Sequence, residues 1–283
     1  MIFLSSIEPY LSRPVHSFLN YLRAHRPAAI KAHKKSIEDF SHKVTEINTH
    51  GLELLVESDY PTVLNGPFRG LTYLSESSGS ALLPKIIGSY EEPIYHIIDE
   101  IVSSNLYDFI VDVGCAEGFY AVGFAKFVPK ARIVAYDINS QAISLAKQLA
   151  ELNAVSKKVS FRSEFTVSEL ANFTSSGDVS LNTLLFMDVE GAELSLLNPS
   201  LNCYLPLLDI LVELHDCFHS GLTDLILDYL GKTHSCHFLQ DYPWCSHDYS
   251  LPETVVKSPH MHLFFDEFRP SGKRWLYAKR RPY

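Results

Sequence analysis

The chain has 283 residues, of which 46% are hydrophobic and 12% aromatic, and its formal net charge is −9 at pH 7. This length and composition indicate a globular protein with a substantial core. The acidic balance argues against nucleic-acid binding, which needs clustered Lys and Arg. The sequence has no run of about 18 apolar residues that could cross a membrane, and its first residues lack the positive segment of a signal peptide. We therefore expect a cytoplasmic protein that binds neither nucleic acid nor membrane.

Residues 1–88 are expected to form an extension that precedes the main domain. Apolar residues spaced three and four apart before residue 50 predict one or two amphipathic helices, separated near Pro27. The glycines and prolines that follow alternate with aromatic and aliphatic residues, which indicates ordered loops and short strands. We expect this extension to act as a lid or to mediate a homodimer, and we assign residues 89–283 to the main domain.

From about residue 93 onward, helix patterns alternate with apolar strand patterns. The strands are predicted at 108–114, 132–138, 158–163, 183–190 and 208–216. Such alternation is typical of a parallel sheet that helices cover on both faces. After residue 230 the pattern changes to two further strands, joined by a long loop with several prolines.

The first of these strands ends in a glycine turn, VDVGCAEG, over residues 111–118. Gly114 and Gly118 let the backbone turn sharply and let a ligand approach closely. The turn follows the carboxyl end of a strand, which is where open parallel sheets bind ligands. The dinucleotide fingerprint G-x-G-x-x-G is absent because Ala116 occupies its second glycine position, and no phosphate-binding P-loop is present.

Two acidic residues indicate which ligand this turn holds. Asp112 would repel a pyrophosphate but attract a sulfonium or an amino group. Asp137, at the end of the second strand, can accept hydrogen bonds from ribose hydroxyls. Together with Gly114 and Gly118, these residues resemble the cofactor motif of class I S-adenosylmethionine-dependent methyltransferases.

The resemblance implies a Rossmann-like α/β fold with a seven-stranded sheet, whose last two strands form an antiparallel hairpin. It also implies S-adenosylmethionine as the cofactor. In that family the acidic residue after the third strand lies near the adenine, and Glu164 is the matching residue here. The further cofactor contacts that we expect are Tyr90, Glu91, Ala116, Ile138 and Asp188.

A second motif follows the fourth strand, FMDVEGAELSLL, in which Asp188 to Glu193 read D-V-E-G-A-E. This motif resembles the FkbM-type branch of these methyltransferases, and the likeness extends over residues 65–280. The resemblance implies O-methylation of a hydroxyl on a sugar, a lipid or a secondary metabolite, so the expected partner is a small-molecule or glycan acceptor.

A hydroxyl acceptor needs either a general base or a metal ion. Asp188 and Glu190 lie on the same side of the fourth strand, and Glu213 and His215 share a side of the fifth. His215 is the first candidate for the base because an unperturbed imidazole titrates near neutral pH, although a purely structural histidine is equally compatible with the sequence. Alternatively, Asp188, Glu213, His215 and Asp216 could gather around Mg²⁺, which prefers carboxylates.

Two other functions stay open at this point. One is a nicotinamide-dependent oxidoreductase on a similar sheet, although the missing glycine fingerprint counts against it. The other is an inactive subunit that binds the cofactor. A hydrolase is disfavoured because no G-x-S-x-G nucleophile elbow is present.

Overall fold

The computed structural model describes residues 27–56, 59–180, 182–239, 249–268 and 273–281. The chain divides into two compact units, residues 1–50 and 51–283. Helix α3 (Pro27–Leu55) begins at the expected proline and ends within the second unit. This second unit starts at residue 51, so residues 51–88 cluster with the sheet, whereas we expected the boundary after residue 88. Among the helices that the structure describes, none is long and apolar enough to span a membrane.

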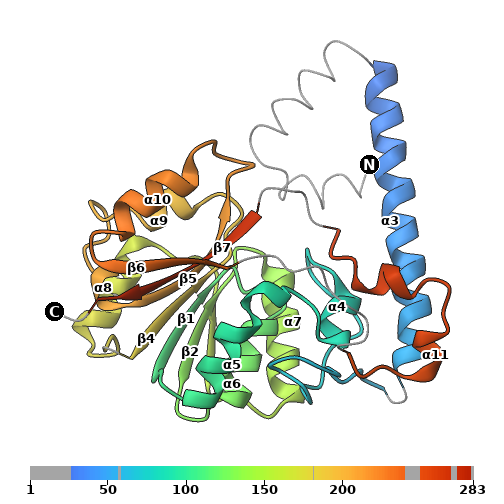
Figure 1. Cartoon of the computed structure of the whole chain (residues 1–283), viewed down its shortest axis with the longest axis horizontal. Coiled ribbons are helices and arrows are strands. Elements are labelled where there is room, and N and C mark those ends of the chain that lie inside the picture. Colours follow the sequence, from blue (N-terminus) through green and yellow to red (C-terminus); the bar gives the residue numbers. More distant parts are fainter. Residues whose placement is uncertain (1–26, 57–58, 181, 240–248, 269–272, 282–283) are drawn as a thin grey trace. The chain divides into compact units, whose positions relative to one another are not determined.

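A seven-stranded sheet forms the centre of the second unit, with the strand order β3-β2-β1-β4-β5-β7-β6 (Figure 1). Strands β1 to β5 are parallel, and β7 runs antiparallel to both β5 and β6. The expected Rossmann-like sheet with an antiparallel end is therefore confirmed. The strands are β1 (Phe109–Val113), β2 (Arg132–Tyr136), β3 (Val159–Arg162), β4 (Thr183–Met187), β5 (Asp209–His215), β6 (His234–Leu239) and β7 (Lys273–Arg280).

Helices lie on both faces of this sheet, with α6 and α7 on one face and α8 and α10 on the other (Figure 1). Alternate residues of β1, β4 and β5 pack against α8 and α10, as Val111 and Met187 do. On the opposite face, Phe186 packs against Tyr120 of α6 with ring centroids 4.5 Å apart. Burial on both faces explains why these strands are apolar throughout.

The helices after α3 are mostly short. They are α4 (Leu82–Ile87), η2 (Glu92–Ile94), α5 (Tyr95–Ser104), α6 (Phe119–Phe127), α7 (Ser140–Leu152), α8 (Val167–Ser175), α9 (Glu193–Leu196), η3 (Leu205–Leu207), α10 (Leu222–Leu230), α11 (Glu253–Val256) and η5 (Met261–Phe265).

The carboxyl ends of β1, β4 and β5 meet at one edge of the sheet. Val113 pairs with Met187, and Met187 pairs with Val212. One residue further on, the N–H of Asp188 donates to the carbonyl of Val113 at 2.9 Å. Asp188 therefore lies between the glycine turn after β1 and the last residues of β5, which brings the two predicted site regions together.

Candidate active site

The turn between β1 and α6 is packed directly against β4. Gly114 has φ +89°, and a Cβ atom on it would lie 1.6 Å from the carbonyl oxygen of Asp188. The N–H groups of Gly114 and Cys115 both donate to the carbonyl of Tyr136, at 2.8 and 2.9 Å. Glycine is required at position 114 because neighbouring backbone approaches so closely, before any ligand is considered.

Asp112, within β1, is a buried carboxyl next to this turn. Its exposed fraction is 1%, and neither oxygen has a hydrogen-bond partner among the described residues. Burial, reinforced by the nearby charges of Asp137 and Glu91, raises the pKa of Asp112 to about 8. Buried polar groups normally have partners, so an ammonium group of a ligand would complete the hydrogen bonding of this carboxyl.

Asp137 follows β2 and holds the turn from the other side. Its Oδ2 accepts a hydrogen bond from the N–H of Ala116 at 2.8 Å, and its Oδ1 accepts one from the N–H of Asn139 at 2.7 Å. A carboxylate can accept about four hydrogen bonds, so two ribose hydroxyls could still be bound. Ile138 is 84% exposed beside it and offers an apolar surface on which a base could lie.

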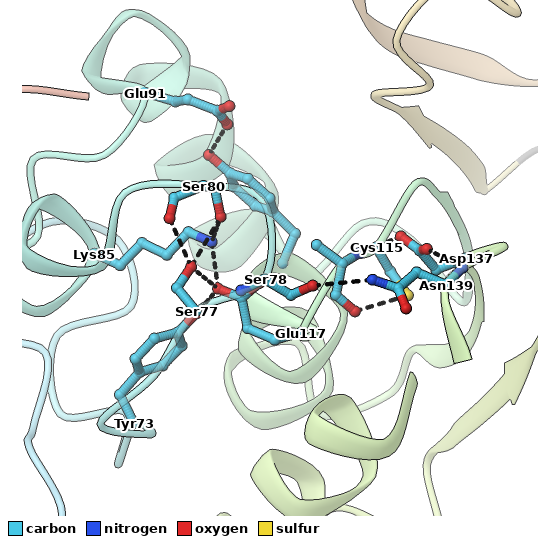
Figure 2. Close-up of polar contacts among 12 residues, drawn as sticks. Tyr73, Ser77, Ser78, Ser80, Lys85, Glu91, Cys115, Glu117, Asp137 and Asn139 are labelled. Carbon is cyan, nitrogen blue, oxygen red and sulfur yellow. Dashed lines mark hydrogen bonds and ion pairs between the residues drawn. The ribbon is translucent and has the colours of Figure 1, made fainter. Parts of the chain in front are cut away.

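Glu117, inside the turn, ties the turn to an upstream segment that includes α4 (Figure 2). Its buried carboxylate pairs with Lys85 Nζ at 2.5 Å and accepts hydrogen bonds from the hydroxyls of Tyr73 and Ser77 and the N–H of Ser78. Burial opposes ionisation, but the ammonium of Lys85 and these hydrogen bonds outweigh it and lower the pKa of Glu117. Sequence reasoning did not single out Glu117, because no local pattern links it to a lysine 32 positions earlier.

The same upstream segment reaches the residues around Asp137. The Nδ2 of Asn139 donates to the hydroxyl of Ser78 at 3.2 Å (Figure 2). The ring of Tyr90 lies 4.6 Å below Lys85 Nζ, and the carboxylate of Glu91 accepts a hydrogen bond from Tyr120 at 2.5 Å. Tyr90 and Glu91 are thus buried against the start of α6, and their contact with the cofactor stays a prediction.

A second cluster surrounds the fully buried imidazole of His215 at the end of β5. Its Nδ1 pairs with Glu193, which is also fully buried. Its Nε2 lies 3.0 Å from Glu213 Oε2 and 3.5 Å from both Asp188 Oδ1 and Glu190 Oε2. The ring of Phe218 stacks on the imidazole, with centroids 5.6 Å apart. Four carboxylates from β4, α9 and β5 therefore converge on one histidine next to the glycine turn.

Residues 108–187, which run from just before β1 to the end of β4, match a family model described as a methyltransferase domain. The stretch contains the glycine turn, Asp112 and Asp137, and it lies in the expected seven-stranded fold. Over these residues the chain is therefore similar to a methyltransferase domain.

Other comparisons also found methyltransferases. The release factor glutamine methyltransferase of Synechocystis is 26% identical over 140 residues, which cover 44% of this chain and 44% of that protein. The chain therefore matches less than half the length of this curated relative. Solved structures similar to this chain include an O-methyltransferase from Bacillus cereus in complex with SAH, at 14% identity, 63% and 77% coverage of the two chains and a TM-score of 0.41. Another is a SAM-dependent O-methyltransferase from Thermotoga maritima, at 12% identity, 69% and 66% coverage and a TM-score of 0.39.

His215, which lies beyond the matched stretch, differs from the expected neutral base. Burial disfavours its charged form, but the pairing with Glu193 and Glu213 and the charge of Asp188 outweigh burial and raise its pKa to about 10. The premise that this imidazole titrates near neutral pH is therefore wrong. The sequence could not show this raised pKa, because Glu193, which pairs with His215, comes from a separate helix.

Asp216, an expected metal ligand, has other partners. Asp216 accepts hydrogen bonds from the N–H and the hydroxyl of Thr223, so it holds the first turn of α10 instead of joining Asp188. Glu164 is exposed after β3, which pairs with β2, so its expected place near the adenine stays a prediction. Glu190 was also weighed as the cap of the short helix, but the N–H of Gly191 donates to Glu193.

Proposed function

We propose that the chain transfers the methyl group of S-adenosylmethionine to a hydroxyl oxygen of a small molecule or glycan. The observation that carries this proposal is the cluster of carboxylates around His215, which adjoins the glycine turn through Asp188. A hydroxyl becomes a good nucleophile only when its proton has an acceptor, and this cluster offers several. The Asp188-to-Glu193 motif, which resembles the FkbM-type branch, supports the same acceptor class.

The cofactor side of the site follows from the contacts around the turn. Asp112 would bind the amino group of the methionine part, since its carboxyl is buried and has no described partner. Asp137 would bind the ribose hydroxyls, and Ile138 would pack against the adenine. The bound cofactor supplies an activated methyl group on a sulfonium, and holding it in line with the acceptor provides much of the catalysis.

On the acceptor side, we assign Glu190 as the general base that takes the proton of the acceptor hydroxyl. Its side chain is 58% exposed, so an acceptor can reach it, and its carboxylate lies 3.5 Å from His215 Nε2. Its φ of +48° is unusual for a residue other than glycine, and such backbone conformations cluster at functional sites. In the step, a lone pair of the acceptor oxygen forms the O–C bond, the S–C bond breaks with its electrons going to sulfur, and the hydroxyl proton passes to Glu190. His215 keeps this carboxylate in position.

The test is a product analysis with methyl-labelled S-adenosylmethionine and a panel of hydroxylated, amine and amide acceptors. We expect label in a methyl ether, detected by mass spectrometry and NMR, and a loss of turnover of at least about 100-fold in Glu190→Gln, as is typical when a general base is removed. The matched control is Asp228→Asn on the exposed face of α10, which should leave turnover unchanged. Label found only on an amide nitrogen, the acceptor that the name of the Synechocystis relative implies, would refute O-methylation.

A further inference from the structure

We propose that Asp188, Glu213 and His215 bind a divalent first-row transition-metal ion. The three ligand atoms are a carboxylate oxygen from each acid and a ring nitrogen of the histidine, and all lie within 4.8 Å of one another. Asp188 follows β4 and the other two residues end β5, so the backbone of two adjacent strands fixes the group. This site goes beyond the methyl transfer proposed above, and it does not depend on the identity of the acceptor.

The two distances from His215 Nε2 to its neighbours in the group are those between adjacent ligands of one ion. Metal–ligand bonds of about 2.0–2.2 Å place adjacent ligands about 3.0 Å apart at right angles and about 3.4 Å apart in a tetrahedron. His215 Nε2 lies 3.0 Å from Glu213 Oε2 and 3.5 Å from Asp188 Oδ1. One ion could therefore bind all three atoms with little movement of the side chains.

The orientation of the imidazole is the second, independent observation. Nε2 is fully buried and makes no well-aligned hydrogen bond within the described part of the chain, although three carboxylate oxygens lie within 3.5 Å of it. This nitrogen thus lies among carboxylate oxygens, the nearest of which belongs to Glu213. On its other side, Nδ1 pairs with the buried Glu193. A carboxylate that orients the second ring nitrogen is the usual support of a metal-bound histidine.

The donor set indicates the kind of ion. Imidazole suits Zn²⁺, Fe²⁺ and similar ions, carboxylates also suit Mn²⁺, and Mg²⁺ prefers oxygen ligands alone. One imidazole with two carboxylates therefore favours Mn²⁺ or Zn²⁺ over the Mg²⁺ that the sequence suggested. The side chains of Asp188 and Glu190 are 22% and 58% exposed, so an acceptor could reach an ion held by this group. A hydroxyl bound there would lose its proton more easily.

The experiment uses the full chain, dialysed against a chelator and titrated with Mn²⁺ by electron paramagnetic resonance and with Zn²⁺ by calorimetry. We expect one site per chain with a micromolar dissociation constant. Pulsed electron paramagnetic resonance of the bound Mn²⁺ should show a nitrogen coupling from one histidine. This measurement uses the wild-type protein, so it does not depend on a variant that folds. Titration of the same samples with S-adenosylhomocysteine shows that the protein is folded.

Variants then locate the site. His215→Gln should abolish the nitrogen coupling, and Glu193→Gln should weaken metal binding by about 10- to 100-fold. Asp216→Asn is the matched control, because an asparagine can still accept the N–H of Thr223 at the start of α10 and metal affinity should not change. Folded protein that binds S-adenosylhomocysteine but neither metal below about millimolar concentration, or Mn²⁺ bound without nitrogen coupling, would overturn the metal site. Metal binding without S-adenosylhomocysteine binding would instead count against the proposed methyl transfer and leave the metal site standing.

Discussion

Glu117 of the glycine turn and Lys85 of α4 form an ion pair at 2.5 Å in which the two side chains are 0% and 3% exposed. The pair connects the cofactor turn to a segment more than 30 residues upstream, and Tyr73, Ser77 and Ser78 complete the hydrogen bonding of the carboxylate. The turn is therefore held by two neighbours, Asp137 after β2 and this upstream segment.

Removing one member of this pair should be costly. Lys85→Met leaves a buried carboxylate without its counter-ion, so we expect a loss of about 3–5 kcal/mol in the free energy of unfolding. Combining it with Glu117→Gln should cost clearly less than the sum of the two single changes, because the double variant buries no unpaired charge. Urea unfolding of the wild type, the two single variants and the double variant gives the coupling energy between the two positions.

The control is Lys232→Met, which removes an exposed ion pair with Asp228 and should change stability by less than about 1 kcal/mol. Additive effects at positions 85 and 117 would show that the pair is not coupled.

Gly114 should tolerate no side chain. In Gly114→Ala the new Cβ would collide with the carbonyl of Asp188 at 1.6 Å, so β1 and β4 would have to separate and S-adenosylhomocysteine binding should be lost. Gly177→Ala is the matched control, because it has a similar positive φ of +78° with nothing within 4 Å. We expect it to cost only about 1–2 kcal/mol of backbone strain and to bind the ligand normally. The two variants are compared by thermal unfolding and ligand titration. If both lose the same stability and affinity, backbone strain and not the close approach to Asp188 explains the effect at position 114.

The sheet and the cofactor half of the site could be predicted from sequence because their signals are local. Apolar strands and the spacing of Asp112, Gly114, Gly118 and Asp137 each lie within a few tens of residues, and parallel topology brings strand ends together. The contacts of Glu117 and Glu193 could not be predicted, because each depends on a partner from a different element. Local sequence likewise does not indicate whether an acid such as Asp216 will face the site or cap the next helix.

The raised pKa of Asp112 predicts a pH dependence of cofactor binding. At pH 7 this carboxyl is mostly protonated, since its pKa is about 8, and the ammonium of the ligand favours the ionised form. Binding of S-adenosylhomocysteine should therefore release a proton below pH 8, and the affinity should rise up to about tenfold per pH unit between pH 6 and 8. Calorimetry in buffers of different ionisation enthalpy measures the released proton. Asp112→Asn should remove both effects, and an unchanged pH profile in that variant would exclude Asp112 as their origin.

The same group predicts how stability varies with pH in the ligand-free protein. The folded pKa of about 8 lies above the unfolded value of about 3.9. Between these values the folded state binds one more proton than the unfolded state, so Asp112 makes stability fall as pH rises from about 4 to about 8, by up to about 1.4 kcal/mol per unit. Urea unfolding at several pH values should give a flatter profile for Asp112→Asn than for the wild-type protein. Parallel profiles would mean that Asp112 is ionised in the folded state.

The assignment of S-adenosylmethionine to the glycine turn depends most directly on one measurement, a calorimetric titration of the full chain with S-adenosylhomocysteine, with NAD as the competing ligand. We predict micromolar binding of S-adenosylhomocysteine, about −8 kcal/mol, that is lost in Asp137→Ala and kept in Asp228→Ala, whose side chain lies on the exposed face of α10. Binding of NAD in its place, or of neither ligand to protein that unfolds cooperatively, would contradict the assignment of the turn and of the residues around it.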